Sequence, residues 1–383
     1  MTGPHPRLPV RGADVSMTEE VERLGGLYRD ADGAPGDLFE ILAGAGLDTV
    51  RLRLWVDPYD EQGRPYLGGT NDLATTVRLA RRARDAGLDL LLDLHYSDFW
   101  TDPKKQAMPK AWRGMSGSRL TDQVHTYTVS VLDTLAAADV APSMVQVGNE
   151  ITNGLLWPEG RVVRFDDATR SFGPADPAAD DRLAALLGAG TSAVRASTDA
   201  RVALHLDFGG AGALYRGWFD RMTARDVDLD VIALSYYPFW HGSLAELADN
   251  LADISHRYGK DVLVAETAYA FTAEAPRGHH PIFSAELAEA GGYPPDVRGQ
   301  SAFLADLAQV VADVPQDRGL GLVYWEPAWL PVAGTSWASP AGMAYGDDVA
   351  VGGNPWANLG LFDFSGTALE SLRVLGGSSG RPS

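Results

Sequence analysis

The stretch Met144-Val145-Gln146-Val147-Gly148-Asn149-Glu150 is the segment from which the fold can be predicted. Its apolar and strand-compatible residues run into a glycine, an amide and a carboxylate, and residues 155–158 beyond it are typical of a loop. This pattern predicts a buried strand with Asn149 and Glu150 at its carboxyl end. A carboxylate beside an amide suits acid chemistry on a hydroxyl-rich ligand, provided that a second carboxylate faces it.

An apolar run, a polar and aromatic loop and a helical segment follow one another eight times along the chain. The predicted strands are residues 8–14, 49–55, 88–95, 144–150, 201–207, 231–237, 262–269 and 320–325. The helices are expected to begin near Asp37, Asp72, Arg119, Asp180, Ala211, Ser243 and Ser301, with a short last one after Gly366. Alternating apolar strands and helices indicate a parallel sheet, and eight such units indicate a single-domain α/β protein with a closed (β/α)8 TIM barrel.

The barrel is expected to span residues 9–375, with residues 1–8 as an N-terminal extension and residues 376–383 as a polar, disordered tail. A barrel of this kind needs about 250 residues. The surplus of the 383-residue chain is therefore placed in the loops after the third, fourth, seventh and eighth strands. These loops lie on the face where such barrels hold their active sites.

The composition limits the possible partners. A formal charge of -19 argues against nucleic acid or an anionic membrane, because both attract clusters of Lys and Arg. There is no cysteine, so disulfides and thiol chemistry are excluded. Neither a signal peptide nor a membrane-spanning run is found, so a cytoplasmic location is expected for the chain as written, and a secreted one if a leader was removed. We expect a monomer with a neutral ligand.

The second carboxylate is expected from Glu266, at or near the end of the predicted seventh strand. Two carboxylates across a barrel mouth can flank a glycosidic bond, one protonating the leaving oxygen and the other attacking the anomeric carbon. Tyr237 can donate a hydrogen bond to Glu266, and burial can raise the pKa of Glu150 toward that of a general acid. Each glutamate alone could be an ordinary polar residue at a strand end, but the two together favour catalysis.

Two arginines in the second predicted strand can make the pKa values of these two carboxylates differ. Arg51 and Arg53 share one strand phase, so Arg51 is expected to point into the barrel near Glu266 and keep it ionised. The alternative for either arginine is a structural ion pair with Asp48 or Asp57.

Two His/Asp pairs are predicted at the barrel mouth. Asp93 and His95 share a face of the third strand, and His205 and Asp207 share a face of the fifth. Such pairs could ligate a metal. The first strand lacks the His-x-His pattern of metallohydrolase barrels and no lysine ends the fourth, so we expect these pairs to orient the acid and bind sugar hydroxyls.

The tryptophans are unevenly placed. Only Trp218 of the ten falls in a predicted helix, and the others follow strand ends. An indole stacks on the apolar face of a pyranose, so this placement favours a polysaccharide-binding cleft. Within the set, Trp112 and Trp356 are expected to be packing residues. The nine are Trp55, Trp100, Trp112, Trp157, Trp240, Trp325, Trp329, Trp337 and Trp356.

Seven short blocks occur in order along the chain. They are GADVS at 12–16, RLRLWVDP at 51–58, DLHYSDFW at 93–100, GNEI at 148–151, SYYPFW at 235–240, AET at 265–267 and YWEPAW at 324–329. In these blocks the chain resembles the β-1,4-galactanases of glycoside hydrolase family 53, over residues 11–364 and beyond. The resemblance implies a retaining (β/α)8 hydrolase of clan A that cuts internal β-1,4-galactosyl bonds of type I arabinogalactan.

The resemblance also assigns roles by position. It makes Glu150 the acid/base, Glu266 the nucleophile and Asn149 the group that binds the 2-hydroxyl of the sugar. It places four residues in support of them: Arg51, His95, Tyr237 and Trp325. Further residues expected to support the site or bind substrate are Asp14, Arg53, Asp93, Asp98, Trp100, Trp157, His205, Asp207 and Trp329.

One segment departs from the family pattern. Bacterial members often carry an acidic calcium-binding segment after the seventh strand, but residues 271–280 hold only Glu274. Calcium takes about six to eight oxygen ligands. Asp347 and Asp348 could contribute, but no cofactor is expected to be required. Two alternatives stay open: a clan A glycosidase acting on mannan, xylan or β-glucan, and a catalytically silent carbohydrate-binding barrel.

Overall fold

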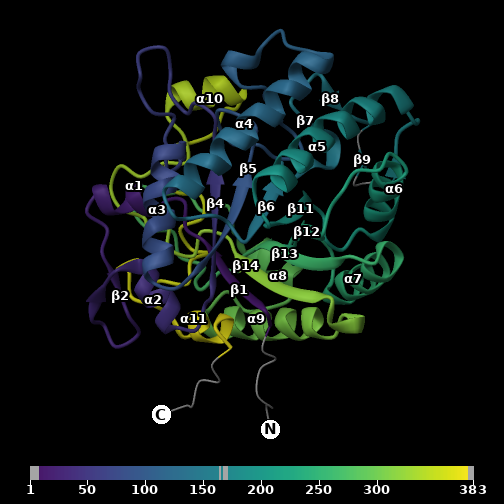
Figure 1. Cartoon of the computed structure of the whole chain (residues 1–383). Coiled ribbons are helices and arrows are strands. Elements are labelled where there is room, and N and C mark those ends of the chain that lie inside the picture. The colour runs from purple at the N-terminus through teal and green to yellow at the C-terminus, as the bar shows by residue number, and fades with distance from the viewer. Residues whose placement is uncertain (1–7, 164, 167–170, 378–383) are drawn as a thin grey trace.

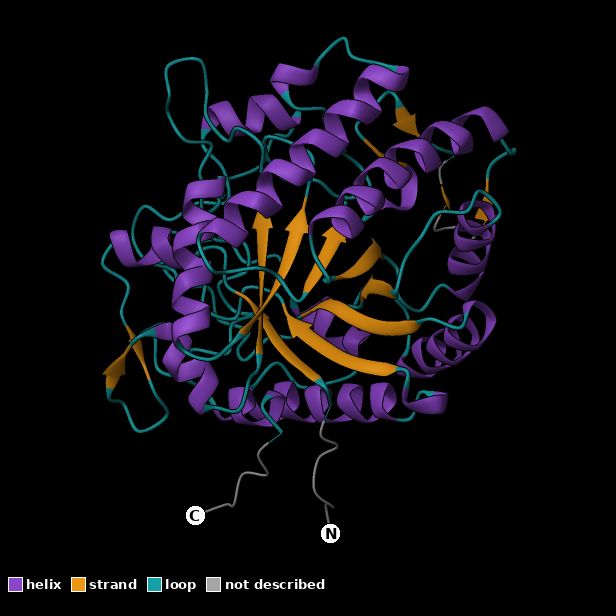
Figure 2. Cartoon of the chain, in the orientation of Figure 1, coloured by secondary structure: helices purple, strands orange, loops and turns teal. Residues whose placement is uncertain are grey.

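Eight parallel strands close into a barrel at the centre of the molecule (Figures 1 and 2). The computed structural model describes residues 8–163, 165–166 and 171–377. Each strand pairs with the next, and β14 pairs with β1 to complete the closure. The strands are β1 (Val10–Asp14), β4 (Thr49–Leu54), β5 (Asp89–Leu94), β6 (Met144–Val147), β11 (Arg201–Leu206), β12 (Val231–Ser235), β13 (Asp261–Thr267) and β14 (Gly319–Tyr324). All eight predicted strands and the single-domain TIM barrel are confirmed. Most of the predicted extension and tail lies outside the described residues.

Helices surround the barrel (Figure 2). They are α2 (Leu38–Gly44), α3 (Leu73–Asp85), α4 (Gly117–Ala137), α5 (Pro177–Ser197), α6 (Gly212–Thr223), α7 (Leu244–Tyr258), α9 (Val297–Ala312) and α11 (Glu370–Leu375). Their starts follow capping chemistry: Asp72 accepts the Thr75 N–H at the start of α3, and Ser243 and Glu246 form a capping box on α7. The predicted starts near these caps are confirmed. The helix α9 begins about a turn before the predicted Ser301, because Asp296 caps it.

Short elements in the loops were not predicted from the sequence. They are α1 (Thr18–Arg23), β2 (Tyr28–Arg29), β3 (Pro35–Gly36), η1 (Lys110–Trp112), η2 (Ile151–Asn153), β7 (Gly154–Leu155), β8 (Gly160–Arg161), β9 (Phe165–Asp166), β10 (Ser171–Phe172), α8 (Ala285–Gly291), η3 (Pro315–Asp317) and α10 (Pro340–Gly346). Most lie in the long loops after β5, β6, β13 and β14. Among the described residues, no helix is both long and apolar enough to cross a membrane.

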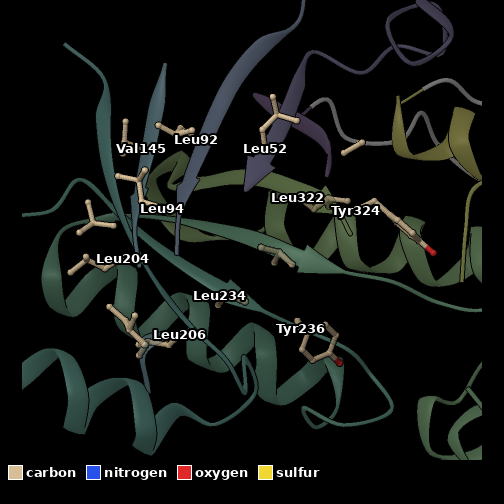
Figure 3. Packing of buried hydrophobic residues seen from close by; sticks show 14 of the residues in the cluster. Leu52, Leu92, Leu94, Val145, Leu204, Leu206, Leu234, Tyr236, Leu322 and Tyr324 are labelled. Atoms are coloured by element: carbon tan, nitrogen blue, oxygen red, sulfur yellow. The ribbon is translucent and has the colours of Figure 1, made fainter. Parts of the chain in front are cut away.

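The strands of the barrel pack on both faces, outward against the helices and inward against one another. Outward-facing strand residues such as Leu52, Leu204 and Leu234 belong to one buried apolar cluster with helix residues (Figure 3). Inside the barrel, a smaller apolar cluster that includes Leu91 and Ala203 fills the lower part. Two residues further along the same strands, the side chains that face inward become charged and polar. An apolar cluster therefore lies below a polar layer at the carboxyl ends of the strands, where TIM barrels hold their active sites.

Candidate active site

The Arg51 guanidinium is the centre of the polar layer. It lies on β4 and is 1% exposed. Its Nη1 is 2.7 Å from Glu266 Oε1 and 3.1 Å from Asp14 Oδ2, and its Nη2 is 2.7 Å from Asp93 Oδ2. Nη2 also donates to Asn149 Oδ1 at 2.9 Å. One side chain thus connects β4 to β1, β5 and β13 and to the residues after β6. Its contact with Glu266 is the one expected from the sequence.

A second arginine makes a parallel network. Arg53 Nη1 is 3.1 Å from Asp14 Oδ1 and 2.5 Å from Glu326 Oε1. The alternative of structural pairs with Asp48 or Asp57 is wrong for both arginines. Those carboxylates pair elsewhere, Asp48 with Arg11 at 2.8 Å and Asp57 with Lys110 at 3.4 Å, because they lie outside the barrel interior.

Glu150 and Glu266 approach each other through one hydroxyl. Ser235 Oγ is 2.7 Å from Glu150 Oε1 and 3.5 Å from Glu266 Oε2, so these two carboxylate oxygens are at most 6.2 Å apart. Glu266 also accepts a hydrogen bond from the Tyr237 hydroxyl at 3.3 Å. Glu150 has a positive φ of 46°, which turns its side chain out of the strand direction and toward Ser235. The pair predicted from two distant strands is brought together at the barrel mouth.

The two carboxylates titrate apart. Burial, together with the charges of Glu266 and Asp207, raises the pKa of Glu150 well above its usual value. Burial also raises the pKa of Glu266, but Arg51 opposes that rise. Arg51 lowers the pKa of Glu266, in the direction expected from the sequence, but burial raises that pKa by more. Glu150 remains the member of the pair that holds a proton more strongly.

The two histidines contact Asp93 and the backbone of Glu150. His95 Nε2 is 3.1 Å from Asp93 Oδ2, and its Nδ1 accepts the Thr101 N–H at 3.2 Å. His205 Nδ1 lies 3.4 Å from the Glu150 backbone nitrogen. Among the described residues, no group of three or more His, Cys, Asp or Glu side chains could hold a metal ion. The positions of both histidines agree with the orienting role.

A row of tryptophans lies beside the carboxylates. The Trp325 ring centroid is 5.9 Å from that of Trp100, 6.2 Å from that of Trp329 and 4.7 Å from that of Trp356. The Trp356 ring is in turn 6.0 Å from Trp240, whose side chain is 42% exposed. Trp356 therefore packs within this row, and its expected role as a packing residue stays a prediction.

Two residues join the row to the carboxylate networks. The guanidinium carbon of Arg53 is 4.2 Å from the Trp100 ring centroid, and the Tyr237 ring is 6.1 Å from Trp356. A cation over an indole face is attracted by the ring quadrupole. The aromatic surface and the charged layer are thus held as one structure.

Some residues expected near the substrate serve the scaffold instead. Asp98 is buried and accepts the N–H groups of Asp57 and Lys110, so it holds the loop after β5. Trp55 is fully buried. Trp112 is also buried, as expected for a packing residue.

Trp157 lies apart from the tryptophan row. Its ring centroid is 4.4 Å from the Arg161 guanidinium carbon. It lines a separate pocket of about 480 Å³ with Met108 and Met115. Asp207, by contrast, stays near Glu150 and accepts a hydrogen bond from the Thr152 hydroxyl.

Three buried residues of the site were not predicted. Glu326 pairs with Arg53, Gln146 accepts from Arg51 Nε at 3.2 Å, and Ser235 lies between Glu150 and Glu266. Strand periodicity could have identified Gln146 and Ser235. Each has the same position in the strand alternation as a predicted site residue, so its side chain is expected to point into the barrel. Glu326 lies in the quoted YWEPAW block but has a φ of 44°, which no strand pattern reveals.

In the loops after β13 and β14, His279 and Asp348 contact other protein groups. His279 is engaged on both ring nitrogens, with the Asn354 N–H at 3.0 Å and the Pro331 carbonyl at 3.1 Å. Asp348 is 2.5 Å from Lys105 Nζ. His279 thus joins the loops after β13 and β14, and Asp348 joins the loop after β14 to the loop after β5.

A (β/α)8 barrel with one carboxylate just after β6, a second on β13 and a tryptophan row beside them defines a glycoside hydrolase. The sequence model of glycosyl hydrolase family 53 matches residues 10–375, and the chain belongs to this family. It is 43% identical to an uncharacterized Niallia circulans protein in the bgaB 5' region, over 96% of this chain and 93% of that one. It is 36% identical to the endo-beta-1,4-galactanase of Bacillus subtilis (strain 168), over 95% and 85%. The solved family 53 catalytic domain of Ignisphaera aggregans superposes with a TM-score of 0.87 at 39% identity, covering 98% of each chain.

Replacing Arg51 with methionine should destabilise the fold strongly. The change leaves Asp14, Asp93 and Glu266 buried without their shared cation, and breaking a buried ion pair from one side costs about 3–5 kcal/mol. Urea unfolding at neutral pH measures the difference. The control is Arg78→Met, which removes a half-exposed partner of Glu19 and should cost about 0–1 kcal/mol. Equal losses for the two variants would contradict the central role of Arg51.

Proposed function

We propose that this chain is an endo-β-1,4-galactanase that cleaves the galactan backbone of type I arabinogalactan with retention of configuration. The observation that carries the mechanism is the hydroxyl bridge between Glu150 and Glu266. The limit of 6.2 Å between the two facing oxygens agrees with the carboxyl separation of about 5–5.5 Å that retaining enzymes use. The galactanase names of relatives such as the Bacillus subtilis enzyme support the choice of sugar.

The first step transfers the galactosyl unit to the enzyme. Glu266 attacks the anomeric carbon while Glu150 gives its proton to the leaving glycosidic oxygen. Arg51 and Tyr237 orient the nucleophile through bonds of 2.7 and 3.3 Å. Burial prepares Glu150 for its role, because a raised pKa keeps the acid protonated near neutral pH.

The second step releases the sugar. The ionised Glu150 takes a proton from water, which attacks the anomeric carbon and breaks its bond to Glu266. Asn149 binds the 2-hydroxyl in both transition states. Its Oδ1 is occupied by Arg51 and one amide hydrogen by the Thr101 carbonyl at 2.9 Å, so the second amide hydrogen serves the sugar.

Digestion of potato galactan should test the substrate. The enzyme should release reducing ends from galactan faster than from mannan, xylan or cellulose, with oligosaccharides of several lengths appearing early. Activity should be unchanged in a chelator, because the mechanism needs no metal. Preference for another glycan would favour a sister glycosidase, and binding without hydrolysis would favour a silent barrel.

Azide rescue should separate the two carboxylate roles. With an aryl β-galactobioside as substrate, Glu266→Ala plus azide should give the α-configured azide, because azide replaces the missing nucleophile in a single displacement. Glu150→Ala plus azide should give the β-configured azide, because azide then attacks the galactosyl-enzyme. NMR of the products distinguishes them. A β product from Glu266→Ala would exclude Glu266 as the nucleophile.

A further inference from the structure

Ser235 touches both carboxylates of the catalytic pair. It is fully buried at the carboxyl end of β12. Its oxygen is 2.7 Å from Glu150 Oε1 and 3.5 Å from Glu266 Oε2. A serine hydroxyl has one hydrogen and can donate it to only one of the two at a time.

His205 determines the direction of this hydrogen bond. Its Nε2 is 2.9 Å from Ser235 Oγ. Its Nδ1 faces two donors, the Gln146 amide nitrogen at 3.1 Å and the Glu150 backbone N–H at 3.4 Å. Asn149 Oδ1 is also 3.0 Å away, but the Glu150 N–H can only donate and has no other acceptor among the described residues. The donors at Nδ1 place the ring proton on Nε2, where it is given to Ser235.

The imidazole stays neutral in this arrangement. Burial, reinforced by the Arg51 charge, lowers the pKa of His205 well below its ordinary value. A neutral ring with its proton on Nε2 is a donor to Ser235 Oγ and cannot accept from it. The hydrogen of Ser235 is therefore left for a carboxylate.

We propose that Ser235 is a positioning residue whose hydrogen bond moves from Glu266 to Glu150 as the negative charge passes between them. This inference rests on the proposed function. In the free enzyme Glu266 is ionised and receives the Ser235 hydrogen, while the protonated Glu150 donates to Ser235 Oγ. When Glu266 bonds to the anomeric carbon and the Glu150 proton passes to the leaving oxygen, the hydroxyl turns to the new carboxylate on Glu150. The turn is a rotation about one C–O bond.

The charges around Glu150 show what this hydrogen bond opposes. Burial is the largest influence raising the pKa of Glu150, followed by the carboxylates of Glu266 on β13, Asp207 after β11 and Asp102 in the loop after β5. The Ser235 hydrogen bond lowers that pKa. Removing the hydroxyl should therefore make Glu150 hold its proton to higher pH.

The pH dependence of kcat/KM on potato galactan tests the proposal. In Ser235→Ala the alkaline limb, which reports the acid, should move up by about one to two pH units, because the ionised Glu150 loses a hydrogen bond to its charged form. The acid limb should move less in the same direction, since the contact with Glu266 is longer. A folded Ser235→Ala enzyme with both limbs unmoved would overturn the proposal.

Two further variants complete the test. Thr267→Val removes a buried hydroxyl at the end of β13 that has no hydrogen-bond partner among the described residues, and it should leave both limbs in place. An equal shift in this control would also overturn the proposal. Ser235→Cys retains a weaker donor and should give an intermediate shift, so it decides the outcome if Ser235→Ala does not fold. If the unaltered enzyme fails to cleave galactan, the proposed function falls and this inference falls with it.

Discussion

The buried guanidinium of Arg51 is the interaction on which the site depends. It holds Asp14, Asp93 and Glu266 within 3.1 Å, on three different strands. Such charges are costly to bury unless they are paired. The ion pairs therefore hold these carboxylates in fixed positions at the mouth of the barrel.

The balance of charges at the barrel mouth bears on the raised pKa of Glu150. Arg51 and Arg53 supply two positive charges, whereas Asp14, Asp93, Glu266, Glu326 and Glu150 supply five carboxylates. The cations go to the acids they touch, and Glu150 has no guanidinium contact among the ion pairs of the described residues. Burial then raises the pKa values of Glu150 and Glu326 well above normal. Four of these carboxylates are buried and share the two guanidinium groups, whereas Glu150 beside them has no such partner among the described residues.

Much of this arrangement could be predicted from sequence because it follows strand periodicity. Arg51, Asp93 and His205 point inward for the same reason that Leu52, Leu92 and Leu204 point outward. The prediction of inward-facing residues failed where the backbone does not follow the two-residue alternation of a strand. Glu326 reaches the charged layer through a left-handed backbone conformation, and the partners of Trp356 and Trp157 depend on how long loops fold over each other. These contacts are set by tertiary packing, which local patterns do not encode.

In the proposed mechanism, Glu150 and Glu266 act as a pair by double displacement on a β-galactosyl bond. Proton NMR of the reducing end during early galactan digestion tests this most directly, because it reports the configuration before mutarotation. The β-anomer should appear first, with the α-anomer growing later at the rate of spontaneous equilibration. Initial appearance of the α-anomer would contradict the account.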